Sequence, residues 1–268
     1  MRITQLMRGA LLMGVAGAVI LLERRRRARA YVERPSTHIA RNLAVAGLAA
    51  ATVHTLEAPA VMPLARLAAS RRWGIVSRLP GRPWLRDIAA IVLLDYTLYI
   101  WHILVHRIPW LWRFHLVHHV DLDLDASTGL RFHAGEIAAS IPWRAAQVVA
   151  IGVTPRALTL WQSLTIASVL FHHSNTKFDE PVERILSWIV ATPRMHAIHH
   201  SVNPAQLQSN FSSGLAIWDR LHRTARFDAD AGEVTVGVIG HLDPDDVTLP
   251  SVLELPFSPR ALSPTSHG

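Results

Sequence analysis

Four apolar stretches separated by basic segments run along this chain and predict helices that lie in a membrane. The first stretch, Gly9 to Leu22, is uncharged and is followed by Glu23 and an arginine run that ends at Arg29. Because a cleaved signal peptide carries its charge before the apolar run, we expect an uncleaved anchor. A full crossing needs about 20 residues, so this short run is expected to lie partly in the membrane interface.

Two further apolar stretches precede the first histidines. Asn42 to Ala65 contains Pro59 and Pro63, which predict a kinked helix or a hairpin. A basic linker from Arg66 to Arg86 leads to the third stretch, Ile88 to Trp101. We therefore divide the chain into N-terminal anchor helices with a basic linker (1–86), a catalytic segment (87–223) and a polar, proline-rich tail (224–268) that reads as loops with little helix.

Composition narrows the chemistry. Half of the 268 residues are hydrophobic and no cysteine is present, which excludes disulfides, iron–sulfur clusters, thiolate-ligated haem and cysteine zinc sites. The formal charge of +7 comes from arginine, with Lys177 as the only lysine. These arginines gather at the ends of apolar stretches, as the positive-inside rule expects, so we discount nucleic-acid binding.

Histidine spacing is the strongest signal in the sequence. His102 and His106 form HxxxH, while HxxHH occurs twice, at His115–His119 and at His196–His200, with the pair His172 and His173 between them. Residues three and four apart share one face of a helix, so each motif aims its imidazoles at one point. With one of the central pair, about nine nitrogen ligands result, which is too many for one tetrahedral zinc and predicts two transition metals.

Other single histidines are interpreted as satisfied polar residues or surface residues. These are His38, His54, His222, His241 and His267.

The fourth apolar stretch, Ala145 to Phe171, predicts a helical hairpin. His119 and His172 lie on either side of it and must reach one site, so the chain must return to the same side of the membrane. At about 1.5 Å per residue, the stretch is long enough for one crossing and short for two. Gly152, Pro155 and Arg156 near its middle therefore favour a shallow re-entrant pair of helices.

The motifs together resemble the fatty acid hydroxylase and sterol desaturase superfamily of integral-membrane di-iron oxygenases. The resemblance covers about Ile88 to Arg223. It rests on Asp95-x3-Tyr99-x2-His102-x3-His106, Leu111-Trp112-Arg113-Phe114-His115-x2-His118-His119, Arg131-Phe132-His133-x2-Glu136, His172-His173-Ser174-Asn175, Met195-His196-x2-His199-His200-Ser201, Asn210-Phe211 and Trp218-Asp219-Arg220-Leu221.

The resemblance implies an all-α integral membrane protein, a helical bundle with re-entrant or hairpin helices around a histidine-lined dimetal site at the cytoplasmic face. It implies two iron ions, with O2 as co-substrate. Carried over by motif, the ligands are His102, His106, His115, His118, His119, His196, His199 and His200, with one or both of His172 and His173. Four further residues resemble the family's positions near the site and are expected either to hold a ligand in place or to be a further ligand: His133, Glu136, Asp95 and Asn175.

The predicted function is oxygenation of a lipid, such as a fatty acyl chain or a sterol, by hydroxylation or desaturation. No GxGxxG fingerprint is present, so electrons are expected from a separate ferredoxin or reductase. That donor is expected to dock on Arg107, Arg113, Arg194 and Arg220, unless these arginines serve only as lipid anchors. We expect a bacterial inner-membrane location. The alternative is a histidine-rich membrane metal-binding or transport protein.

Overall fold

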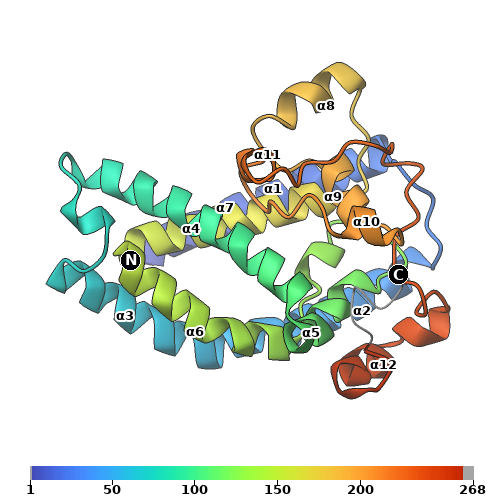
Figure 1. The fold of residues 1–268 in the computed structure, drawn as a ribbon, viewed down its shortest axis with the longest axis horizontal. Coiled ribbons are helices and arrows are strands. Elements are labelled where there is room, and N and C mark those ends of the chain that lie inside the picture. Colours follow the sequence, from blue (N-terminus) through green and yellow to red (C-terminus); the bar gives the residue numbers. More distant parts are fainter. Residues whose placement is uncertain (1, 262–268) are drawn as a thin grey trace.

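The fold consists of a bundle of long helices with a cap of short helices at one end (Figure 1). The computed structural model describes residues 2–261, which contain helices and loops and no β-strand within that range. The predicted all-helical fold is confirmed. Three stretches are long and apolar enough to cross a membrane, namely Leu6–Arg25, Pro35–Arg78 and Pro83–Arg107.

Proline begins many of these helices, because a residue at the first helical position has no intrahelical partner for its N–H and loses nothing without one. Pro35, Pro83, Pro109, Pro155 and Pro193 all occupy this position. The long elements are α1 (Arg2–Arg25), α2 (Pro35–Thr52), the π-helical η1 (Val53–Glu57), α3 (Ala58–Arg71), α4 (Pro83–Arg107), α5 (Pro109–His119), α6 (Ala134–Ile151) and α7 (Pro155–His173).

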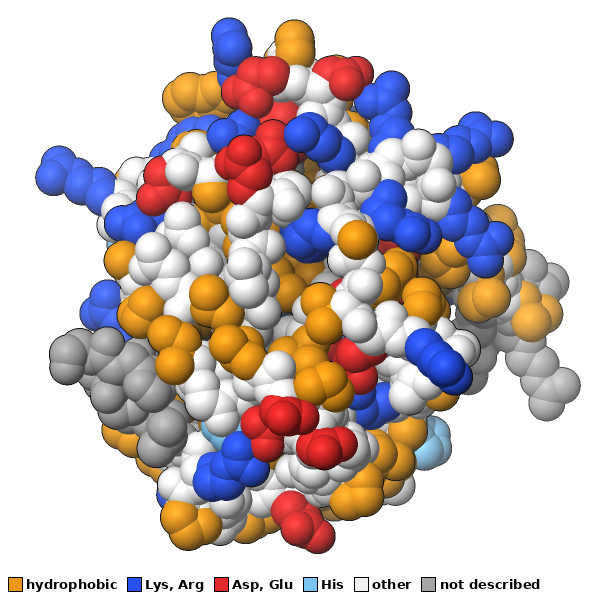
Figure 2. All heavy atoms as spheres, turned by 90° about the vertical axis from the view of Figure 1, so that its right-hand side faces the viewer, with side chains coloured by type: hydrophobic (Ala, Val, Ile, Leu, Met, Phe, Trp, Pro, Cys, Tyr) orange, Lys and Arg blue, Asp and Glu red, His pale blue; other side chains and the backbone are white. Residues whose placement is uncertain are grey.

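Short elements complete the chain between these helices and in the cap. They are η2 (Val76–Arg78), η3 (Thr128–Leu130), α8 (Glu180–Leu186), α9 (Pro193–His199), α10 (Pro204–Leu207), α11 (Ile217–Leu221), η4 (Pro244–Val247), α12 (Leu249–Glu254) and η5 (Leu255–Phe257). Seen from the cap end, the surface carries basic, acidic and hydrophobic side chains side by side (Figure 2).

The N-terminal helices differ from the sequence expectation in three ways. Helix α1 has 24 residues, more than the apolar run, and is long enough for a crossing. The second stretch is one helical run from α2 through η1 to α3, so its prolines do not open a hairpin; Pro59 lies in the first turn of α3, where proline is tolerated. The predicted linker is partly wrong, since α3 continues to Arg71.

The helical hairpin predicted for the fourth stretch is confirmed, but it is not shallow, because α6 already begins at Ala134 and the two helices have 18 and 19 residues. Helix α6 ends at Gly152, which has φ 85° in the left-handed region, and α7 begins three residues later. Thr154 caps α7 by accepting a hydrogen bond from the amide of Ala157. Gly74, at φ 80°, approaches Gly152 so closely that a Cβ on either residue would overlap the other segment.

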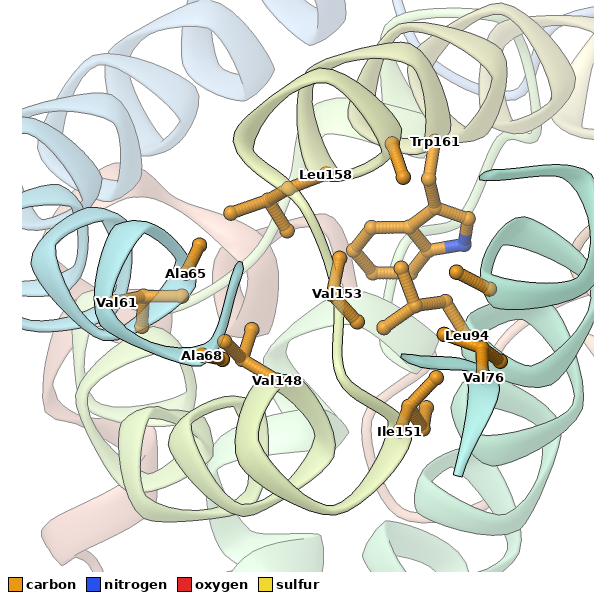
Figure 3. Packing of buried hydrophobic residues seen from close by; sticks show 12 residues of the cluster. Val61, Ala65, Ala68, Val76, Leu94, Val148, Ile151, Val153, Leu158 and Trp161 are labelled. Atoms are coloured by element: carbon orange, nitrogen blue, oxygen red, sulfur yellow. The ribbon is translucent and has the colours of Figure 1, made fainter. Parts of the chain in front are cut away.

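The bundle core lies where α3, α4, α6 and α7 meet (Figure 3). Large side chains such as Leu94, Leu158 and Trp161 interlock there with Ala65 and Ala68. Within a bilayer, lipid is as apolar as leucine, so association depends on close packing, and small residues let helix backbones approach one another. The core holds α6 and α7 beside α4, which fixes the direction of the histidines at their ends.

We expect Gly152→Ala to destabilise the protein. Alanine at this left-handed position costs about 1 kcal/mol from backbone strain alone, and its Cβ would lie 2.2 Å from the carbonyl oxygen of Trp73. The thermal unfolding midpoint of the detergent-purified protein should fall.

Gly47→Ala is the matched control, because Gly47 lies within α2 with no atom near the added Cβ. There, alanine should be neutral or stabilising by up to about 1 kcal/mol. An unfolding midpoint for Gly152→Ala equal to that of Gly47→Ala would contradict this account of the turn.

Candidate metal centre

The ten histidines of the four motif segments lie together at the junction between the bundle and the cap. They come from the last two turns of α4, the last turn of α7, α5, and α9 with the residue that follows it. Each is buried. The HxxHH motifs lie on helices of 11 and 7 residues, shorter than expected, and His200 follows the last residue of α9.

Nine of these imidazoles form two groups whose ligand atoms lie within 4.8 Å of one another. His172 belongs to neither group, although its ring centroid lies 4.2 Å from that of His196. The first group is His102, His106, His115, His119 and His199, and the second is His118, His173, His196 and His200.

Backbone carbonyls set the tautomers of several rings. Nδ1 of His102 lies 2.7 Å from the carbonyl oxygen of Phe211, and Nδ1 of His199 lies 2.7 Å from that of Ser209. Nδ1 of His173 is 2.8 Å from the carbonyl of Val169. A carbonyl can only accept, so each Nδ1 carries the proton and donates it. In the neutral ring, Nε2 then carries no proton and has a free lone pair.

The lone pairs of His102 and His199 face each other, and the lone pair of His173 points at two further imidazoles. Nε2 of His102 and Nε2 of His199 are 3.1 Å apart, and neither carries a proton to share. In the second group, Nε2 of His173 lies 3.0 Å from that of His118 and 2.8 Å from that of His196. Two imidazole nitrogens bound at right angles to one ion at about 2.1 Å lie about 3.0 Å apart. The donor sets therefore fit metal ions.

Burial keeps the His199 and His200 rings of the second HxxHH motif neutral. Burial, followed by the neighbouring imidazole of His102, lowers the pKa of His199 well below its usual value. Burial and His118 do the same to the pKa of His200. Neutral imidazole is the form that binds metal, so at neutral pH these nitrogens are ready as ligands.

The four predicted neighbours of the site fall in different places. Glu136 accepts from Nδ1 of His115 at 3.0 Å and so orients a ring of the first group. His133 lies outside both groups and caps α6 by accepting from the amide of Gly135. Asp95 accepts from the indole of Trp218 and the amide of Leu215, and Asn175 bonds the backbone of Arg29.

A polar network behind the first HxxHH motif was not anticipated from the sequence. Fully buried Asp121, two residues after His119, accepts from Arg131 at 2.9 Å and from Arg41 at 3.2 Å. Burial alone would raise the pKa of Asp121, but Arg131 and His38 hold it below its usual range. Nε of Arg131 also donates to the carbonyl of Val117. The network ties the end of α5 to α2.

The remaining histidines have other partners. His38 contacts Asp121 at 2.9 Å, and Nε2 of His241 donates to the carbonyl of Arg260, as the interpretation of satisfied polar residues requires. His222 contacts the Tyr96 hydroxyl, and His54 is exposed. His267 lies outside the described residues.

A cavity of about 150 Å³ opens beside the histidines between α4, α6 and α7. Its apolar wall includes Leu98, Trp101, Val105, Ile137 and Val169, and its inner end reaches His102, His115, His118, His172, His173 and His196. An apolar slot that ends on neutral imidazoles suits a hydrocarbon chain.

Helices of membrane length, an apolar cavity and two clusters of buried imidazoles together define a membrane protein whose histidine site could hold metal ions. The fatty acid hydroxylase family model matches residues 88–224. This is about half of the chain and includes every histidine of the two groups, and the chain belongs to that family of non-haem iron oxygenases.

Curated relatives carry names of lipid oxygenases. The chain is 30% identical to ornithine lipid hydroxylase OlsE of Rhizobium tropici, over 57% of this chain and 45% of the relative. It is 27% identical to alkylglycerol monooxygenase of Xenopus tropicalis, over 48% and 28%. Against human cholesterol 25-hydroxylase, identity is 24% over 51% and 49%. In each case the match spans less than half of the relative. No solved structure matches the chain.

We expect Glu136→Gln to weaken metal binding without unfolding the protein. Glutamine is a weaker acceptor for Nδ1 of His115, and losing such a partner typically costs tenfold to a hundredfold in metal affinity. Titration of the purified apoprotein with ferrous iron, followed by metal analysis, measures the change.

Asp95→Asn serves as the comparison, because Asp95 holds the 215–218 segment and no histidine. It should lower the thermal midpoint and leave iron affinity unchanged. If both variants bind iron like the wild type, Glu136 does not support the centre.

Proposed function

We propose that this chain is a di-iron oxygenase that uses O2 and external electrons to hydroxylate or desaturate a membrane lipid. The observation that carries the proposal is the pair of groups of closely spaced, buried imidazole nitrogens at the end of an apolar cavity. Two bound iron ions would activate O2, the oxidant, for attack on an unactivated C–H bond. The first group would hold one ion and the second group the other.

The chain's own residues exclude water and position the substrate. Leu98, Val105 and Val169 line the approach to the histidines, so a hydrocarbon chain entering there displaces water from the reacting end. A reactive oxidant requires such exclusion. Phe132 stacks on His118 with ring centroids 4.8 Å apart and fixes that ring against the cavity.

A lipid substrate is supported by the names of the relatives, which include an ornithine lipid hydroxylase, an alkylglycerol monooxygenase and a cholesterol 25-hydroxylase. Those three names denote different lipids, and their shared element is oxygen insertion into a lipid. We therefore assign the substrate to the lipid class, with hydroxylation and desaturation as the two outcomes of the same site.

An external electron donor remains part of the proposal. Among the four arginines expected to receive it, three have partners in the cap. Arg113 donates to the carbonyls of Pro256 and Ser258, Arg194 to those of Ala229 and Phe227, and Arg220 to that of Ser187. Arg107 is exposed. We therefore propose that the electron donor docks on Arg107 and on the charged surface of the cap seen in Figure 2.

Transport or storage of metal is the less favoured alternative. A transport path needs ligands spread along the membrane normal, whereas the nine clustered nitrogens come from the adjoining ends of α4 and α7 and from α5 and the α9 segment. Their burial beside a cavity with apolar walls also favours chemistry on a lipid over passage of an ion.

We propose that the cap and histidines face the cytoplasm of a bacterial inner membrane. Arginines lie at both ends of the bundle, for example Arg24 in the last turn of α1 and Arg78 at the end of η2 between α3 and α4, so charge alone does not choose the orientation. Because the chain has no cysteine, single cysteines report accessibility cleanly.

For this orientation, we expect Arg156→Cys, near the hairpin turn, to react with a membrane-impermeant maleimide in intact spheroplasts. Glu254→Cys, which lies exposed in α12, should react only after lysis. The opposite pattern would place the histidines outside, and labelling of both positions only after lysis would mean that the hairpin does not reach the far side.

We expect His118→Ala and His199→Ala to abolish lipid oxidation while leaving membrane insertion intact. Each removes one nitrogen from a different group, so each variant should lose mainly one of two bound ions. Iron-loaded protein, reductant, O2 and a bacterial lipid extract provide the assay. Mass spectrometry should show a gain of one oxygen or a loss of two hydrogens, with matching O2 consumption.

His54→Ala is the control, because His54 is exposed in η1 and belongs to neither group. It should keep most of the activity and about two metal ions per chain. Loss of metal from His54→Ala equal to that from His199→Ala would refute the ligand assignment, and wild-type protein that binds metal without consuming O2 would favour the storage alternative.

A further inference from the structure

One charged pair beside the cavity, of which Arg144 forms part of the wall, takes no part in the metal centre. Arg144 of α6 lines the cavity, and its Nε lies 3.4 Å from a carboxylate oxygen of Glu57. The Arg144 side chain is 20% exposed and that of Glu57 is 5% exposed. Burying charged residues inside a membrane bundle costs free energy, and such residues usually mark a substrate or ion pathway. We therefore expect the pair to have a function.

Helix geometry places Arg144 at the opposite end of the cavity from the histidines. Glu136, Ser140 and Arg144 recur every four residues and share the cavity face of α6. Eight residues of helix separate Glu136, which bonds His115, from Arg144, a rise of about 12 Å. Between these ends the wall is largely apolar. A lipid chain could therefore span from the pair to the metal ligands.

The local backbone delivers Glu57 to this position. Glu57 ends the π-helical turn η1, which interrupts an otherwise α-helical run, and this turn packs against α6. π-Helical turns are rare and are frequent at functional sites. The guanidinium also lies over the ring of Trp161 at 5.2 Å. Arg144 is thus held by a carboxylate on one side and an indole on another.

The pair still has hydrogen-bonding capacity. Nε of Arg144 is buried and makes no hydrogen bond, because its approach to Glu57 is an ion pair without hydrogen-bond geometry. An unpaired buried donor is costly and favours a ligand that supplies an acceptor. Since Glu57 already neutralises the guanidinium, a second anion would leave a net negative charge in an apolar region. An uncharged oxygen is the better acceptor.

We propose that Arg144, paired with Glu57, binds an uncharged oxygen of the lipid substrate and so selects a neutral oxygenated lipid over a free fatty acid. An ester carbonyl, an ether or a hydroxyl would each fit. The bond fixes the distance, about 12 Å along the cavity, from that oxygen to the carbon presented to the histidines. This inference rests on the proposed function for its biological meaning, but the binding preference can be measured separately.

The test uses methyl palmitate, hexadecane and palmitate as probes of equal chain length. Equilibrium binding to the metal-loaded protein in detergent micelles is compared for each probe, normalised to its concentration in the micelle. The wild type should prefer methyl palmitate to both others. Arg144→Met should reduce the preference for methyl palmitate over hexadecane about tenfold, the usual effect of losing one hydrogen bond to a charged group. Arg144→Lys should retain most of it.

Glu57→Gln gives the opposite signature. With its carboxylate removed, Arg144 keeps an unneutralised charge, so palmitate should gain about tenfold relative to methyl palmitate. This gain of binding cannot arise from unfolding. Arg66→Met, on the exposed face of α3, should change none of the three affinities.

Three results would overturn the proposal. They are equal binding of methyl palmitate and hexadecane by the wild type, tighter binding of palmitate than of methyl palmitate by the wild type, or a Glu57→Gln variant with unchanged selectivity. A preference for the ester in protein that oxidises no lipid would support the binding site and refute the proposed oxygenase function, so the two can fail independently.

Discussion

Crowding of unprotonated imidazole nitrogens is the constraint on which the rest of this structure depends. Carbonyls of Phe211, Ser209 and Val169 accept hydrogen bonds from the Nδ1–H groups of His102, His199 and His173. The Nε2 lone pairs of these rings therefore point into a buried space, where Nε2 of His102 and Nε2 of His199 are 3.1 Å apart. Without a cation between them, such an arrangement is repulsive and would relax. The helix ends, the cap segments that provide carbonyls and the buried Asp121 network can be understood as the means of holding it.

The cap does more than cover the site. Residues 209–211 supply two of the fixing carbonyls, and Asp219 accepts from the amides of Phe211 and Ser212, so the closing segment of the motif region acts through backbone geometry. On the bundle side, the α6–α7 hairpin brings Glu136 and His173 to the same end. Chemistry is thus confined to the junction, and the cavity extends from it between helices.

Periodicity and spacing were sufficient to predict the helices, the turn at Gly152 and the convergence of the three histidine motifs, because these are local properties of the chain. The hydrogen bonds from histidine Nδ1 atoms to backbone carbonyls were not predictable, because every residue has a carbonyl and the sequence does not show which one lies beside a ring. Asp95 and Asn175 shared a motif with the histidines, yet they hold backbone elsewhere. Glu57 reaches Arg144 because it ends a π-helical turn. The nearby prolines predicted only that this stretch is a kinked helix or a hairpin, and not a π-helical turn.

The most direct test of the central claim is the metal content of the purified protein and its response to single histidine changes. Elemental analysis with Mössbauer spectroscopy of protein from iron-57-grown cells should show two irons per chain in nitrogen-rich sites. His118→Ala and His199→Ala should each lower that number, and His54→Ala should not. Two results would contradict the account of two imidazole groups that hold two ions. One is a single iron per chain that is lost completely in either variant, and the other is an iron content that no histidine variant changes.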